Sequence, residues 1–199
     1  AWRHRQSAPG AIGLEVRRAL ASLEPLPSAR GGFPLSQHPI TRHLHAALAG
    51  GTRETAAIIE ALKPAVYCLP WQYTYSARAD APGLGQNIAF AEIIGPAAPL
   101  PSERACLGFT LIAPGTRYPE HHHPATELYH VLAGSALWTA DGETQRQPPG
   151  AFILHPSQIE HAMETRDEPL LAVYAWTGPD VRTTSVYAAS APAFRHRRI

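Results

Sequence analysis

Side chains able to bind a metal ion cluster between residues 115 and 134, where His121, His123 and Glu127 lie close together. In a β-strand, residues two apart point to the same face, so His121 and His123 can reach one ion while His122 faces away. Two imidazoles and a carboxylate suit Zn²⁺, Fe²⁺, Mn²⁺ or Ni²⁺, and a catalytic ion needs positions left open for substrate or water. The spacing therefore predicts a metal centre that leaves room for chemistry.

A fourth candidate ligand lies downstream. Gly150 and a short apolar run precede Pro156, and His161 follows. A turn and an apolar run before a histidine are expected where a later strand returns beside the first pair of histidines. We therefore expect His161 to join the ligand set.

The first of these segments resembles the first signature motif of the cupin superfamily, G-x5-H-x-H-x3-E-x6-G. Every fixed position is matched, by Gly115, His121, His123, Glu127 and Gly134. The resemblance implies a jelly-roll barrel holding one divalent transition metal ion on these two histidines, the glutamate and the later histidine. It leaves the choice among Zn, Fe(II), Mn and Ni open, because the same ligands accept several ions.

The second segment resembles the second cupin motif, G-x5-P-x-G-x2-H-x3-N, with two departures. Gly150, Pro156 and His161 match, but Gln158 stands where the family usually has glycine and Thr165 where it has asparagine. Both departures fall on turn and packing positions. The ligands implied by the resemblance are therefore intact.

The elements that must position these residues follow from hydrophobic periodicity. Three- and four-residue spacing predicts amphipathic helices over 11–24, 36–49 and 52–63, with Ser36 or His38 as the start of the second. A Pro/Gly/Ser-rich connection, residues 25–34, would join the first two helices. After Pro70 the period changes to two.

The second part of the chain predicts short strands separated by Pro and Gly turns. Trp71, Tyr73 and Tyr75 alternate, and strand-like runs follow at 87–94, 105–113, 127–132, 136–139, 151–154 and 170–176. Such a series predicts an antiparallel sandwich or small barrel. The expected fold is mainly β: a jelly-roll barrel over 71–199 preceded by a helical part over 1–70, together one compact unit.

Composition narrows the function classes. The 199 residues carry a formal net charge of only +1, so neither a nucleic acid nor an anionic membrane surface is an expected partner. No apolar run is long enough to span a bilayer, and the opening residues lack a signal-peptide core. Cys68 and Cys106 form no C-x-x-C motif. We expect a soluble cytoplasmic protein, monomeric or homodimeric, with a basic C-terminal segment at 195–198 left in solvent.

Two further histidines accompany the motifs. His130 lies one position off the inward register, so we expect it to face solvent or to stand behind the ligands. His155 precedes Pro156 near a turn, where a structural role is expected.

The tyrosines around the ligands extend the resemblance from the cupin superfamily to one family within it. The array Tyr118-x2-His121-x-His123-x3-Glu127-x-Tyr129, followed by the later histidine, resembles the dimethylsulfoniopropionate lyases of the cupin class. Those enzymes cleave dimethylsulfoniopropionate to dimethyl sulfide and acrylate. Chain length, the helical first part and the aromatic content also fit, so the resemblance covers most of the chain and implies dimethylsulfoniopropionate as the substrate.

Such an elimination needs one base. The proton to be removed lies next to a carboxylate, whose charge a metal ion would draw off, and the neutral sulfide leaves without a general acid. Tyr129 shares the inward face with Glu127, and a nearby divalent ion would favour its phenolate, so Tyr129 is our candidate base. Alternatively, Tyr129 only packs in the barrel and donates to Glu127. Tyr118 is the second candidate, as base or as a group that orients substrate.

A sulfonium needs a wall that tolerates a cation, and aromatic faces supply one. The candidates are Trp176, Trp138, Tyr174 and the stripe that begins at Trp71. Trp176 is preferred because it ends an apolar strand that should line the barrel. Ordinary core packing remains the alternative for each aromatic.

Two other functions are compatible with a cupin site. One is a metal-dependent dioxygenase of the quercetinase or thiol-oxidising type, which would consume O₂ and need a redox-active ion. The other is a small-molecule-binding cupin without turnover. Because one barrel supports many chemistries, fold alone does not choose among these functions.

Overall fold

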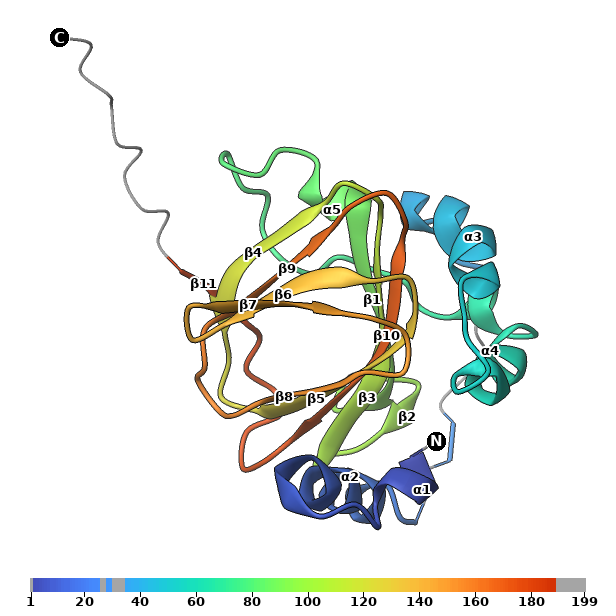
Figure 1. Cartoon of the computed structure of the whole chain (residues 1–199), viewed down its shortest axis with the longest axis vertical. Helices are drawn as coiled ribbons and strands as arrows, with labels where there is room; N and C mark the ends of the chain where they lie inside the picture. Colours follow the sequence, from blue (N-terminus) through green and yellow to red (C-terminus); the bar gives the residue numbers. More distant parts are fainter. Residues whose placement is uncertain (1, 26–27, 30–34, 189–199) are drawn as a thin grey trace, which may run out of the picture.

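The chain folds into a barrel of two facing β-sheets flanked by helices (Figure 1). The computed structural model describes residues 2–25, 28–29 and 35–188. One sheet has the strand order β2-β1-β3-β10-β5-β8, and the other has the order β11-β4-β9-β6-β7. The predicted mainly β architecture is therefore confirmed.

The strands are β1 Ile88–Gly95, β2 Leu100–Pro101, β3 Ala105–Ile112, β4 Arg117–His122, β5 Thr126–Ala133, β6 Ala136–Ala140, β7 Glu143–Gln147, β8 Phe152–His155, β9 His161–Thr165, β10 Leu170–Thr177 and β11 Val186–Tyr187. All six predicted strand runs are present. The sequence did not reveal β2, β7 and β11. Strands β2 and β11 have only two residues each, and the edge strand β7 is exposed along most of its length and lacks the apolar alternation of a half-buried strand.

The six-stranded sheet separates two apolar layers. Along β10, Tyr174 belongs to the cluster inside the barrel, whereas Leu171 and Val173 belong to the cluster on the outer face. The alternation follows from the two-residue period of a strand. Residues that share the inner face of β1, β3, β10 and β5 therefore look into one interior.

Helices flank the barrel. They are α1 Trp2–Arg5, α2 Gly10–Ser22, η1 Pro39–His43, α3 Leu44–Ala49, α4 Ala56–Leu62, η2 Val66–Cys68 and α5 Leu84–Asn87. The outer apolar cluster includes residues of α1, η1, α3, α4 and η2, whereas Leu84 of α5 belongs to the cluster inside the barrel. Helix α2 packs on β5, β8 and β10, and α3 packs on β5 and β10. The three predicted helices exist, but the second begins at Pro39 as a 3₁₀ turn, where His38 Nδ1 accepts from the amide of Ile40 at 3.2 Å.

The alternation of Trp71, Tyr73 and Tyr75 does not correspond to a strand of either sheet. This segment makes only an isolated bridge from Gln72 to Phe90. Its aromatic side chains divide between the two apolar layers, with Trp71 under the helices and Tyr73 against the barrel interior. Residues two apart on a strand would share one face, so this division shows that the segment, which joins the helices to the barrel, does not run as a regular strand.

Two motif positions show why the second cupin motif tolerates its departures. Gln158 adopts a left-handed backbone with φ of 66°, the conformation for which glycine is favoured. Thr165 is buried, and its hydroxyl donates to the carbonyl of Ala113 at 2.6 Å and accepts from the amide of Thr116 at 3.0 Å. The threonine thereby ties the start of β4 to the end of β9.

The predicted division at residue 70 stays a prediction, although the helices before it pack directly on the sheet behind it. The predicted connection at 25–34 lies largely outside the described residues, and the basic segment at 195–198 lies wholly outside them. Within the described ranges, no helix combines the length and the apolar character needed to cross a bilayer.

Candidate metal centre and its cavity

Three predicted ligands meet inside the barrel. His123 lies one residue past β4, Glu127 lies on β5, and His161 begins β9, so both sheets contribute. One possible ligand atom from each lies within 4.8 Å of the others. Glu127 Oε2 is 3.0 Å from His123 Nε2 and 3.3 Å from His161 Nε2, and all three residues are buried. The group can hold a metal ion.

The imidazoles are oriented for ligation through Nε2. Nδ1 of His121, His123 and His161 lies 2.8, 3.0 and 2.9 Å from the carbonyls of Pro119, Ala125 and Ile159, each two residues away. A carbonyl can only accept, so each Nδ1 carries a proton and Nε2 is the atom available to an ion. On His123 an ion would displace the proton that Nε2 shares with Glu127 Oε2. Among the described residues, the buried Nε2 of His161 has no hydrogen-bond partner. A divalent ion would satisfy this donor set.

His121 stands beside this group rather than within it. Its ring centroid is 4.1 Å from that of His161 and 6.4 Å from that of His123. Burial, followed by the charge of His161, lowers the pKa of His121 well below its usual range. A neutral imidazole is the form that binds metal, so His121 stays a candidate fourth ligand.

The closeness of Glu127 to the two histidines shifts the pKa values of the group. Burial alone would raise the pKa of Glu127, but the charges of His123 and His161 and the hydrogen bond of His123 outweigh it and leave the pKa well below its usual range. Burial would lower the pKa of His123, yet the charge and hydrogen bond of Glu127 leave it raised. The metal-free group therefore favours an imidazolium beside a carboxylate.

Trp176 acts on Glu127 directly. Its indole Nε1 donates to Glu127 Oε1 at 2.7 Å, and its ring lies 4.3 Å from that of His123 at an angle of 31°. The indole thus holds the carboxylate oxygen that faces away from the histidines. It lines the cavity as predicted, at the end where the ligands lie.

Three of the four candidate ligands, His121, His123 and Glu127, line a cavity of about 100 Å³. Tyr118 from β4 and Tyr129 from β5 reach it from opposite sheets, and Tyr174 lines it as well. Tyr118 stacks on the ring of His121 at 4.0 Å. Burial raises the pKa of both Tyr118 and Tyr129 well above the usual range, and for Tyr129 the charge of Glu127 adds to the effect.

The other candidate aromatic, Trp138, is not among the residues that line the cavity. It lies behind Tyr129, with ring centroids 5.1 Å apart, and its Nε1 donates to His155 Nε2 at 3.0 Å. Its indole therefore supports the cavity wall from behind.

His155 is closer to the ligands than its sequence position indicated. Strand pairing places it opposite Glu127, and its ring stacks on that of His161 at 4.1 Å and 16°. Burial, followed by the charge of His161, lowers the pKa of His155 to about 3, so its ring is neutral. No signal in the sequence could reveal this contact, because it depends on which strands pair.

The expectation for His130 is wrong. The residue is buried on the outer face of the sheet, stacked on Phe152 at 4.1 Å, and its Nδ1 accepts from the indole of Trp2 at 3.1 Å. Helix α1, which the sequence analysis did not predict, covers it. His130 does lie on the face of the sheet opposite Tyr129, as predicted, but a helix rather than solvent covers that face.

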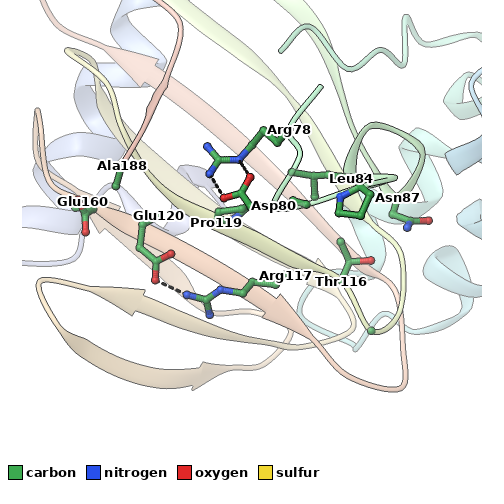
Figure 2. Close-up of a pocket in the computed structure, with 13 residues that line it drawn as sticks. Arg78, Asp80, Leu84, Asn87, Thr116, Arg117, Pro119, Glu120, Glu160 and Ala188 are labelled. Atoms are coloured by element: carbon green, nitrogen blue, oxygen red, sulfur yellow. Dashed lines mark hydrogen bonds and ion pairs between the residues drawn. The ribbon is translucent and has the colours of Figure 1, made fainter. Parts of the chain in front are cut away.

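A larger, open pocket of about 600 Å³ lies on the surface (Figure 2). Arg78 and Asp80 point toward one another there, and Arg117 pairs with Glu120. Arg78 also lies over the ring of Tyr187, 4.3 Å from its centroid. None of the four predicted metal ligands lines this pocket, so it is distinct from the candidate centre.

Comparison with known proteins shows the relatives of this chain. The profile of the dimethylsulfoniopropionate lyase family matches residues 15–172. DddL of Cereibacter sphaeroides, a proposed dimethylsulfoniopropionate lyase, is 36% identical over 169 residues, which cover 84% of this chain and 71% of that protein. The dimethylsulfoniopropionate lyase DddQ of Ruegeria pomeroyi is 33% identical over 136 residues, covering 68% and 67%.

Solved structures agree with these relatives. The crystal structure of DddQ from R. pomeroyi superposes with a TM-score of 0.71 at 31% identity, covering 88% of this chain and 90% of that chain. A chain from the crystal structures of the dimethylsulfoniopropionate lyases RdDddP and RnDddQII superposes with a TM-score of 0.78 and covers 94% and 93%. At 22% identity, the second likeness is one of fold.

Proposed function

This chain belongs to the dimethylsulfoniopropionate lyase family, and from that membership we propose that it cleaves dimethylsulfoniopropionate into dimethyl sulfide and acrylate by a metal-dependent β-elimination. One observation carries the proposal. His123, Glu127 and His161 form a buried group that can hold an ion, and two of its members, His123 and Glu127, line the same small cavity as Tyr129.

The residues present fit a divalent ion held by His123, Glu127 and His161, with His121 as the fourth ligand. When bound, the ion would draw off charge from the substrate carboxylate and would lower the pKa of the Tyr129 phenol, which is high in its absence. Trp176 keeps Glu127 in place through its 2.7 Å hydrogen bond.

Tyr129 is the proposed base. Its phenolate oxygen takes the proton from the carbon next to the carboxylate, and the electron pair of that C–H bond forms the C=C bond of acrylate. The C–S bond breaks at the same time, and its pair leaves on sulfur as neutral dimethyl sulfide. Tyr118, on the opposite sheet, is proposed to orient the substrate or to serve as the base in place of Tyr129.

The size of the cavity supports a small substrate. A cavity of about 100 Å³ is below the roughly 300 to 1,000 Å³ of sites for drug-sized ligands. Dimethylsulfoniopropionate is a short-chain acid, whereas a flavonol is a fused aromatic molecule of several rings. This observation favours the lyase over a quercetinase.

The test is to incubate the metal-reconstituted protein with dimethylsulfoniopropionate and to measure headspace dimethyl sulfide together with acrylate and O₂. We expect the two products in equal amounts without O₂ uptake, and their loss after chelation. Tyr129→Phe should lose turnover and retain its metal, while the exposed Tyr67→Phe should match wild type. Wild-type turnover in Tyr129→Phe would refute the base and move Tyr118 ahead. O₂ consumption without acrylate would overturn the lyase.

A further inference from the structure

The carboxylate of Glu92 lines the cavity on the same sheet as Tyr129, three strands away. Strand register places Glu92 of β1 opposite Gly108, Gly108 opposite Tyr174, and Tyr174 opposite Tyr129. Neighbouring strands lie about 4.8 Å apart, so three strand steps separate the Cα atoms of Glu92 and Tyr129 by about 14 Å. Both side chains line the cavity. One transverse row of the inner face therefore carries the proposed base at one end and an acid at the other.

The acid is held in place by its surroundings. Its carboxylate lies against Gly95, where any Cβ would collide with it, and beside the Sγ of Cys106. Burial raises the pKa of Glu92, and the Cys106 thiol opposes that rise. Among the described residues, no cation lies within ion-pair distance of Glu92. The nearby Arg182, which also lines the cavity, is bonded to Glu103 at 2.5 and 2.9 Å.

Tyr174 places an aromatic ring between the two ends of the row. Gly108 makes this possible, because a Cβ there would lie 2.8 Å from two ring atoms of Tyr174. Burial and then the charge of Glu92 raise the pKa of Tyr174 well above its usual range, so the ring stays neutral. An aromatic face beside a carboxylate is the combination that binds an onium ion, through the ring quadrupole and through charge.

Glu92 also lies at the mouth of the cavity. It lines the inner cavity and an adjoining surface groove of about 300 Å³, and the two spaces share further residues. These are Gln72, Thr74, Val181, Arg182 and Thr184. A cation that enters from the groove would meet the Glu92 carboxylate before its other end reaches the ligands.

We propose that Glu92 is the residue that determines specificity for a sulfonium, binding the positive end of the substrate while its carboxylate is held at the His123, Glu127 and His161 group. This inference rests on the proposed function. It assigns the two ends of a zwitterion to opposite ends of one cavity. Tyr174 supplies the aromatic face at the sulfonium end.

The test compares dimethylsulfoniopropionate with 4-methylpentanoate, an isostere that keeps the carboxylate but has carbon in place of sulfur and so lacks the positive charge. The metal-loaded wild type, Glu92→Gln, Glu92→Asp and Glu60→Gln are examined by steady-state kinetics and by calorimetric binding of both compounds. Glu60→Gln is the matched control, because it removes an exposed, ion-paired carboxylate that lines neither the cavity nor the groove.

Glu92→Gln should raise KM for dimethylsulfoniopropionate about tenfold and change kcat by less than about threefold. The inhibition constant of 4-methylpentanoate should stay within about twofold. Glu92→Asp, which keeps the charge on a shorter side chain, should keep part of the preference, and Glu60→Gln should keep all of it.

An unchanged KM in Glu92→Gln would overturn the inference. Equal weakening of both compounds would overturn it as well, because a merely structural role would affect both alike. If the wild type released no dimethyl sulfide, the proposed function would fail, while calorimetry would still decide whether preference for the cation depends on Glu92. Absence of any such preference in the wild type would refute the role of Glu92 independently of turnover.

Discussion

Replacing Trp176 by phenylalanine should weaken metal binding without removing any ligand. The substitution deletes the indole N–H that donates to Glu127 Oε1 at 2.7 Å but keeps an aromatic ring against His123. A hydrogen bond to a charged group contributes about 1.5 to 3 kcal/mol, and loss of such a supporting contact typically costs 10- to 100-fold in metal affinity. We therefore expect the dissociation constant for Zn²⁺ to rise about 10- to 100-fold.

The assay is competition for Zn²⁺ with a chromophoric chelator, and the control is Trp71→Phe. Trp71 is also a buried tryptophan, and its indole N–H donates to the carbonyl of Val66 at 2.8 Å, under the helices. Its loss should lower the free energy of unfolding by about 1 kcal/mol and leave the Zn²⁺ constant unchanged. A Zn²⁺ constant in Trp176→Phe within twofold of wild type would refute the idea that this indole holds Glu127 for ligation. Equal weakening in both variants would point to general loosening of the barrel.

Three further predictions concern the same barrel. In chelator-treated protein, the raised pKa of His123 contributes stability that is fully present below about pH 6.5 and is lost as the pH rises through the folded-state pKa. The lowered pKa of Glu127 contributes stability that is present above about pH 4.5 and is lost as the pH falls through the folded-state pKa. The melting temperature should therefore fall on both sides of this window, and a decline above pH 6.5 that persists in His123→Asn would contradict the assignment. Gln158→Gly should raise the free energy of unfolding, measured in urea, by about 0.5 to 1 kcal/mol, because relief of left-handed backbone strain exceeds the entropy cost of glycine. An unchanged free energy of unfolding would show that the turn is unstrained. Gly108→Ala should destabilise by about 1 to 3 kcal/mol and raise KM, because its Cβ would lie 2.5 Å from the carbonyl of Ala91 and 2.8 Å from the ring of Tyr174; a wild-type melting curve would refute this contact.

Local sequence patterns were sufficient to predict most helices and strands and the spacing of the candidate ligands. The two-residue period of β5 placed Glu127 and Tyr129 on one face, and the structure confirms that both line the cavity. The same period put His130 on the other face, but periodicity does not say what covers a face. There the short helix α1, whose four residues carry little periodic signal, supplies Trp2 as a cover.

What the sequence determined by itself is the set of groups able to do chemistry: two motif histidines, a glutamate, a later histidine and the tyrosines between and beside them. Which of them touch was decided by tertiary structure. The contact of His155 with His161, and the row from Glu92 through Tyr174 to Tyr129, arise from the pairing of strands that are distant in sequence. The period of a strand fixes only the face toward which a side chain points. Its neighbours on that face depend on strand order and register, which the whole barrel determines when it closes.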